Sequence, residues 1–236
     1  MGAMRTDSDP APPGTWTLVI PLKPLLRAKS RLAGAARAAL RPSLALAFAQ
    51  DTVAAALACP AVRDVVVVTD DALATRELAA LGARVVTDEP ADGLNAALAH
   101  GAQAARALHP ATAVAALNAD LPALRPAELL RVLHSAAAFP RSFLTDAAGI
   151  GTTLLAAAPG VTLAPAFGGP SRARHLASGA SELLVPDVPG VRQDVDTWDD
   201  LAAALELGVG PRTAGAAGPF GPAPWRDLRK SAASPE

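Results

Sequence analysis

Short apolar runs alternate with longer Ala- and Leu-rich stretches over residues 16–138. The apolar runs are typical of strands that a parallel sheet buries on both faces. The stretches between them have the length and composition of helices. This alternation predicts an α/β fold with a right-handed, doubly wound and mostly parallel sheet. Strands are expected at 16–20, 62–69, 83–86 and 113–117, and helices at 42–58, 72–81, 94–108 and 126–138.

The rhythm changes after residue 138. Two apolar runs are separated by the turn-rich segment 146–151, which predicts a hairpin or a small antiparallel insertion. Thr197 has the residue type and position of a helix N-cap, and the two acidic residues in the turn after it complement the helix dipole. Strands are expected at 142–145, 152–156 and 182–185, and helices at 170–178 and 197–208.

The two ends of the chain lack a periodic apolar pattern. Residues 1–15 and 214–236 are rich in Pro, Gly, Ala and Ser, so we expect a disordered N-terminal tail and a loosely ordered C-terminal tail. A chain of 236 residues is long enough for one sizeable α/β domain, or at most two small ones. A single domain over 16–213 is the better interpretation.

Composition and charge exclude several classes of protein. A formal net charge of −1 lacks the basic balance of a general nucleic-acid binder, so we expect no nucleic-acid partner. No apolar run is long enough for a membrane span, and the N-terminus lacks the order of a signal peptide. We therefore expect a cytoplasmic protein without a membrane partner, either a monomer or a homodimer. The single Cys59 cannot form an internal disulfide and is expected to be a small buried hydrophobe.

A basic segment follows the first expected strand. It contains Lys23, Lys29 and Arg31, and no acidic residue stands between Asp9 and Asp51 to pair with them. These cations could hold phosphates and neutralise charge that develops on a leaving group. The glycine signatures of P-loops and dinucleotide-binding loops are both absent. The alternative is a solvated helix face whose arginines extend their charges into water.

The chain has only two asparagines, Asn95 and Asn118. Because the composition is so poor in Asn, each of the two marks a position where another residue would not replace it. We therefore single out both as candidate site residues.

Three carboxylates stand where a metal could bind. Asp120 ends the strand expected at 113–117 and is followed by Leu-Pro, and ligands collect at the carboxyl ends of strands in such sheets. Asp194 and Asp196 flank Val195, so an extended backbone directs both to one side. Two like charges so close favour a cation between them. Helix capping is the alternative, but together the three residues indicate an oxygen-ligand site for Mg²⁺.

A glycine turn runs into the short helix expected at 170–178. Ser171 lies near the start of that helix and could bind a second anion with backbone amides and nearby arginines. Thr152, after Gly151, could add a hydroxyl. His175 could act as an acid or base, but a hydrogen-bonding role is the more common one for a histidine without a grouped partner.

Several of these segments together resemble one enzyme family over about residues 16–213. The family is that of the 2-phospho-L-lactate or phosphoenolpyruvate guanylyltransferases of coenzyme F-420 biosynthesis. The resemblance implies a nucleotidyltransferase fold of the molybdenum-cofactor guanylyltransferase kind, GTP as donor, Mg²⁺ held by Asp120, Asp194 and Asp196, and acid contacts from Thr152, Gly168 and Ser171. The segments that carry it are 20–32, 117–124, 149–152, 167–175, 194–201 and 208–211. Two departures are Ile150, where Thr is common, and Trp198, where Pro is common.

The expected reaction joins the phosphate of a small three-carbon acid to the α-phosphorus of GTP and releases pyrophosphate. Catalysis would rest on positioning and charge stabilisation by Lys23, Lys29 and Arg31, with no general base required. The candidate nucleotide-binding residues are then Lys23, Lys29, Asn95 and Asn118, and Asn95 could read the edge of the base. Phosphoenolpyruvate is favoured over 2-phospho-L-lactate by the high-GC style of the composition. The alternatives are a nucleotidyltransferase acting on a sugar phosphate or a molybdopterin, and a non-catalytic nucleotide-binding module.

Overall fold

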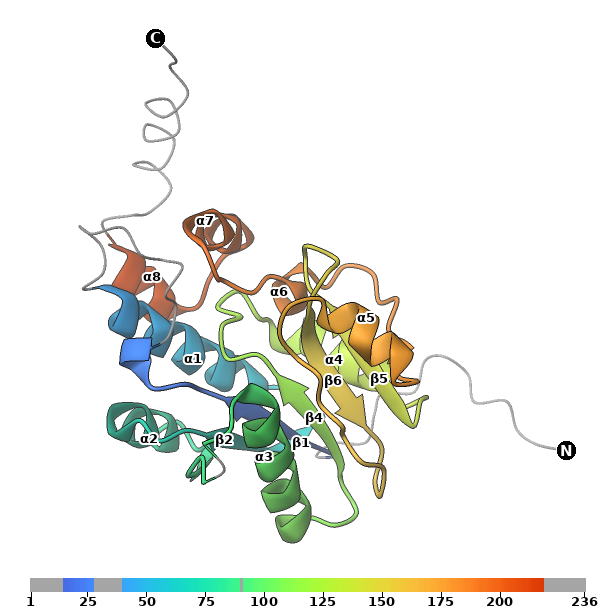
Figure 1. Ribbon diagram of the computed structural model, residues 1–236. Coiled ribbons are helices and arrows are strands. Elements are labelled where there is room, and N and C mark those ends of the chain that lie inside the picture. Colours follow the sequence, from blue (N-terminus) through green and yellow to red (C-terminus); the bar gives the residue numbers. More distant parts are fainter. Residues whose placement is uncertain (1–14, 28–39, 90, 219–236) are drawn as a thin grey trace, which may run out of the picture.

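The structure is a computed structural model, and it describes residues 15–27, 40–89 and 91–218. One seven-stranded sheet forms its centre, with the strand order β3-β2-β1-β4-β6-β5-β7 (Figure 1). The strands are β1 (Trp16–Pro21), β2 (Val62–Val68), β3 (Arg84–Val86), β4 (Ala113–Leu117), β5 (Arg141–Thr145), β6 (Thr152–Ala157) and β7 (Ser181–Glu182).

One strand of this sheet runs against the others in the part of the chain that is described. β1 pairs in parallel with both β2 and β4, and β2 pairs in parallel with β3. β6 is antiparallel to both β4 and β5, whereas β7 is parallel to β5. The expected doubly wound, mostly parallel sheet with a small antiparallel insertion is therefore confirmed, and the insertion amounts to a single reversed strand.

Helices cover both faces of the sheet (Figure 1). Leu18 and Ile20 of β1 belong to a core cluster with α1, α2 and α4, while Val19 packs in a second cluster with α3. This alternation buries both faces and explains why the strands read as continuous apolar runs. The helices are α1 (Arg41–Leu57), α2 (Ala72–Ala79), α3 (Leu94–Leu108), α4 (Pro126–Ala136), α5 (Ser171–Ala177), α6 (Pro189–Arg192), α7 (Trp198–Leu207) and α8 (Pro211–Ala217), with a 3₁₀ turn η1 (Leu25–Arg27).

The C-terminal part differs from the sequence expectations in three places. The strand expected at 182–185 is wrong beyond Glu182, since β7 ends there and Leu184 is exposed. Proline at 186 has no N–H to donate and does not favour a longer strand. The short helices α6 and α8 were not expected, and α8 continues past the domain end expected at residue 213, so the tail assigned from 214 is wrong for its first residues.

Other expectations agree with the structure. Thr197 caps α7, as expected, in a reciprocal capping box with Asp200. Cys59 is buried, and burial raises the pKa of its thiol. No helix among the described residues is long and apolar enough to cross a membrane. The expected tails over 1–14 and 219–236 lie outside the described residues.

Candidate active site

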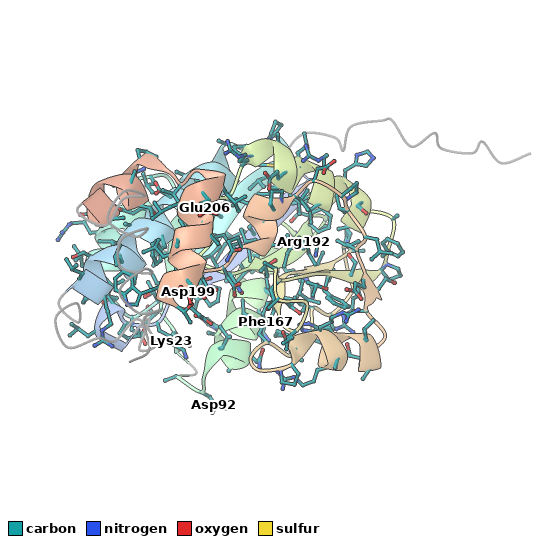
Figure 2. The ribbon with its side chains drawn as sticks, turned by 90° about the horizontal axis from the view of Figure 1, so that it is seen from above. Lys23, Asp92, Phe167, Arg192, Asp199 and Glu206 are labelled. Carbon is teal, nitrogen blue, oxygen red and sulfur yellow. The ribbon has the colours of Figure 1, made fainter. Side chains whose placement is uncertain are left out.

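A cleft of about 650 Å³ opens where β1 and β4 end and β6 begins. In Figure 2, which looks down on the molecule from above, Lys23 and Phe167 mark two sides of this region. The reversed strand explains the assembly, because the start of an antiparallel neighbour lies beside the end of β4. Leu117 pairs with Leu154, and the Asn118 amide donates to the Thr153 carbonyl at 3.0 Å. The sequence-predicted residues that line the cleft are Lys23, Asn118, Asp120, Thr152, Gly168, Ser171, Asp194 and Asp196.

The loop that carries Asp120 is anchored from three distant parts of the chain. The Leu121 amide donates to the Thr52 hydroxyl of α1 at 3.1 Å. The Val195 amide donates to the Asp120 carbonyl at 3.1 Å, and the Gly210 amide donates to the Pro122 carbonyl at 2.9 Å. These bonds fix the position of the Asp120 backbone relative to the Asp194–Asp196 segment.

The C-terminal anchor depends on a buried carboxylate in α1. Asp51 accepts hydrogen bonds from the amides of Arg212 (3.2 Å) and Thr213 (2.7 Å) in the first turn of α8. This site also explains Gly210, because a Cβ at that position would lie 2.3 Å from Asp51 Cγ. The Gly-x-Gly-Pro ending is therefore a structural contact that holds α8 against α1 and supports the Asp120 loop.

Asp194 and Asp196 both line the cleft, as the alternation predicted. Val195 between them is fully buried in a cluster with α1 and α7. The capping alternative is not supported, because the Thr197 hydroxyl accepts from the Asp200 amide and Asp200 accepts from the Thr197 amide at 2.7 Å.

The metal hypothesis can be tested against this geometry. Across the described ranges, no group of three or more His, Cys, Asp and Glu side chains is arranged to hold a metal ion. Asp120, Asp194 and Asp196 share one cleft without forming a closed protein cage. Carboxylate oxygens still fit a hard cation that takes its remaining ligands from water and phosphate, as Mg²⁺ commonly does.

A tight turn shapes the opposite wall of the cleft. Asp146 accepts from the amides of Ile150 (2.9 Å) and Gly151 (2.8 Å). A Cβ at Gly151 would lie 2.3 Å from Asp146 Oδ2, so any larger residue would push the Asp146 carboxylate off these amides. Sequence reasoning missed Asp146, although an Asp that opens a glycine-rich turn is a known signal for side-chain bonding to turn amides. Thr152, the next residue, is thereby held at the start of β6.

The segment before Ser171 is locked by three side chains. The Ala166 amide donates to His175 Nε2 at 3.0 Å, and the Ala166 carbonyl accepts from Arg174 Nε at 3.0 Å. The Phe167 amide donates to Asn95 Oδ1 at 2.8 Å, and the Phe167 carbonyl accepts from Asn95 Nδ2 at 3.2 Å. Every backbone polar group of these two residues thus has a side-chain partner.

This placement changes the interpretation of Asn95. Its side-chain amide bonds the Phe167 backbone and is not among the groups that line the cleft, so the structure does not support the expected contact with a nucleotide. A contact 72 residues away along the chain leaves no local sequence signal. Gly168, which follows Phe167, has φ of +93°, a value that glycine adopts readily.

His175 is fully buried, and its ring packs edge-on against Phe167 with centroids 5.2 Å apart. Burial, with the nearby charges of Arg141 and Arg174, lowers the pKa of His175 to about 4. The imidazole is neutral near pH 7, which supports the hydrogen-bonding interpretation over acid–base catalysis.

The basic segment is only partly described. Lys23 is exposed and lines the cleft. Lys29 and Arg31 lie outside the described residues. Their expected contacts with phosphates therefore stay predictions.

Comparisons with known proteins identify the family and the fold. The model of the MobA-like NTP transferase domain matches residues 30–182. The phosphoenolpyruvate guanylyltransferase of Streptomyces coelicolor is 73% identical over 202 residues, covering 86% of this chain and 95% of the relative. A nucleotidyl transferase from Methanothermobacter thermautotroptrophicus has a similar fold (TM-score 0.60, 23% identity, 82% of this chain and 97% of that chain).

A second solved structure, Rv0371c of Mycobacterium tuberculosis in complex with manganese, aligns with a TM-score of 0.52 at 25% identity, covering 82% of this chain and 99% of that one. The cleft, the sheet and the high identity over most of the chain lead to one conclusion: the chain belongs to the phosphoenolpyruvate guanylyltransferase family, whose members are nucleotidyltransferases with a MobA-like domain.

Proposed function

We propose that this enzyme transfers GMP from GTP to the phosphate of phosphoenolpyruvate and releases pyrophosphate. The observation that carries the proposal is one cleft that brings together Lys23, the carboxylates of Asp120, Asp194 and Asp196, and the hydroxyl-bearing residues Thr152 and Ser171. A nucleotide and a small phosphorylated acid could bind there side by side. The names of relatives at 73% identity support phosphoenolpyruvate as the acceptor and guanylyl as the transferred group.

The chain's residues act by positioning and by charge. Lys23, with Lys29 and Arg31, would bind the triphosphate and stabilise the negative charge on the departing pyrophosphate. Thr152, Gly168 and Ser171 would hold the acid so that a phosphate oxygen faces the α-phosphorus in line. Phosphate oxygens are already ionised near pH 7, so the chain needs no general base, which agrees with a neutral, buried His175.

We further propose that Asp120, Asp194 and Asp196 hold Mg²⁺ together with substrate oxygens. Such a cation, when bound, would neutralise charge on the phosphates. The manganese complex of Rv0371c supports a divalent ion in this fold. Asn118, at the cleft beside Asp120, is proposed as a nucleotide contact.

The setting of the reaction is part of the proposal. GTP and phosphoenolpyruvate are metabolites of the cytoplasm, so we place the enzyme there, as a monomer or a homodimer. The family resemblance places the reaction in coenzyme F-420 biosynthesis. Transfer to a sugar phosphate or a molybdopterin is the alternative reaction, and the relatives' names argue against it.

A pyrophosphate-release assay tests the proposal directly. We would cross the four nucleoside triphosphates with phosphoenolpyruvate, 2-phospho-L-lactate and a sugar 1-phosphate, in Mg²⁺ and in excess chelator. GTP with phosphoenolpyruvate should be fastest. 2-Phospho-L-lactate should give detectable turnover, because a pocket separates such similar shapes by only about 1–3 kcal/mol. Faster guanylylation of the sugar phosphate would reject the proposed acceptor.

Two variants test the carboxylates in the same assay. Asp120→Asn should lose most activity, because removal of a metal-binding oxygen costs several kcal/mol of transition-state stabilisation. Its melting temperature should stay close to that of the natural protein. Asp199→Asn is the matched control, since Asp199 is an exposed carboxylate of α7 that does not line the cleft (Figure 2). Near-normal turnover of Asp120→Asn in Mg²⁺ would show that Asp120 is not a ligand.

A further inference from the structure

His175 joins three parts of the proposed acid pocket. It belongs to α5, its Nε2 bonds the Ala166 amide in the preceding loop, and its Nδ1 lies 3.0 Å from the Thr152 hydroxyl at the start of β6. Thr152 lines the cleft, whereas His175 is buried behind it. His175 therefore touches a cleft residue without lining the cleft itself.

The bond to Ala166 determines where the imidazole proton lies. A backbone amide can only donate a hydrogen bond, so Nε2 must accept with its lone pair. In the neutral ring the proton is then on Nδ1. The charged ring is disfavoured because a second proton on Nε2 would face the Ala166 N–H, and because the Arg141 and Arg174 cations are nearby.

The position of that proton determines the direction of the Thr152 hydroxyl. Nδ1–H donates to Thr152 Oγ1, so this oxygen uses one lone pair on the histidine and cannot donate back to it. The hydroxyl hydrogen must take another direction, and Thr152 borders the cleft. A hydroxyl that is fixed as a donor is suited to an anionic oxygen.

We propose that His175 is a positioning residue of the acid pocket, which sets the Thr152 hydroxyl as a hydrogen-bond donor to an anionic oxygen of the phosphorylated acid. The inference rests on the proposed function, and it adds a residue that acts on the substrate through another side chain. The pocket then selects ionised phosphate or carboxylate oxygens over neutral hydroxyl groups.

Two amide substitutions separate the two bonds of His175. An asparagine amide can occupy the place of Nδ1 and donate to Thr152, whereas a glutamine oxygen can reach the place of Nε2 and accept from Ala166. His175→Asn should therefore keep the KM for phosphoenolpyruvate within about threefold of the natural enzyme. His175→Gln should raise it about tenfold, with the KM for GTP unchanged. The measurement is steady-state pyrophosphate release at saturating Mg²⁺.

A double-mutant cycle distinguishes positioning from simple support of the fold. Thr152→Val should raise the KM for phosphoenolpyruvate by itself, and His175→Gln should add less than twofold in that background. Equal damage by the Asn and Gln changes, or full additivity with Thr152→Val, would overturn the inference. So would an unchanged KM in a folded His175→Gln variant.

The same data separate this inference from the proposed function. If the natural enzyme makes no pyrophosphate from GTP and phosphoenolpyruvate, the proposed function fails whatever the variants do. Calorimetric titration of phosphoenolpyruvate into the natural, Asn and Gln proteins then still tests the pocket. Tenfold weaker binding to the Gln variant alone would support the role of His175, and equal binding to all three proteins would reject it.

Discussion

Replacement of Asp51 should separate helix α8 from the rest of the domain. The side chain of Asp51 is only 2% exposed and accepts two amide hydrogen bonds from the first turn of α8. A bond to a charged acceptor contributes about 1.5–3 kcal/mol. Thr213 is fully buried, so its amide cannot find water once the carboxylate is gone. We expect Asp51→Ala to lower the free energy of unfolding by about 3–5 kcal/mol.

This loss is large relative to the about 5–15 kcal/mol that stabilises a typical domain. At about 2–4 °C per kcal/mol for a protein of this size, the melting temperature should fall by about 10 °C. Asp51→Asn keeps one acceptor oxygen and should lose about half as much. Asp92→Ala is the control, because Asp92 is an exposed loop carboxylate (Figure 2) whose removal should change stability by less than about 0.5 kcal/mol.

Thermal unfolding followed by circular dichroism measures all three variants. If Asp51→Ala lowered the melting temperature by less than about 2 °C, the claim that the carboxylate holds α8 would be refuted. Activity adds a second readout, because the Gly210 amide bonds the Pro122 carbonyl beside Asp120. Turnover of Asp51→Ala should therefore decrease even at temperatures where the protein remains folded.

Three other changes have defined outcomes. Gly151→Ala should force the Asp146 carboxylate off the turn amides and cost about 1–3 kcal/mol in urea unfolding, whereas Gly215→Ala, whose methyl group meets no neighbour, should cost nothing. Folding lowers the pKa of His175 from 6.5 to about 4. The neutral ring therefore contributes its full share to the free energy of unfolding above pH 6.5, and this contribution is lost as the pH falls to 4. His175→Gln should remove up to about 3 kcal/mol of that pH dependence. Lys23→Ala should raise the KM for GTP and leave that for the acid unchanged, and the reverse result would contradict the assigned pockets.

The strand-and-helix rhythm was predictable because each element is long enough to show its period. Val62–Val68 and Leu94–Leu108, for example, lie within a residue of their expected bounds. Asp194 and Asp196 were predictable for a similar reason, since alternation in an extended segment fixes their side. α6 has only four residues and no measurable period, so its start at a proline was the one signal.

The supporting contacts were beyond sequence reasoning. Asp51 bonds an amide 162 residues away, and Asn95 bonds one 72 residues away. Neither partner has a side-chain pattern, because the bonded groups are backbone atoms that every residue carries. The scarcity of asparagine drew attention to Asn95, but only the folded chain shows that its side-chain amide holds the Phe167 loop.

The reversed strand β6 has a consequence for how acceptor range can change. Thr152, Gly168 and Ser171 all lie between β5 and β7, on one continuous stretch of chain that enters and leaves at the outer part of the sheet. Lys23 and Asp120 follow the earlier strands β1 and β4. Within the sheet this stretch joins them where β6 pairs with β4, and outside the sheet Asn95 of α3 also bonds its Phe167 backbone. The residues proposed to bind the acid are thus concentrated in one segment of the chain. We expect the 141–182 region of a relative, transplanted whole, to carry that relative's preference for its acid substrate. The affinity of the host enzyme for the nucleotide should stay unchanged.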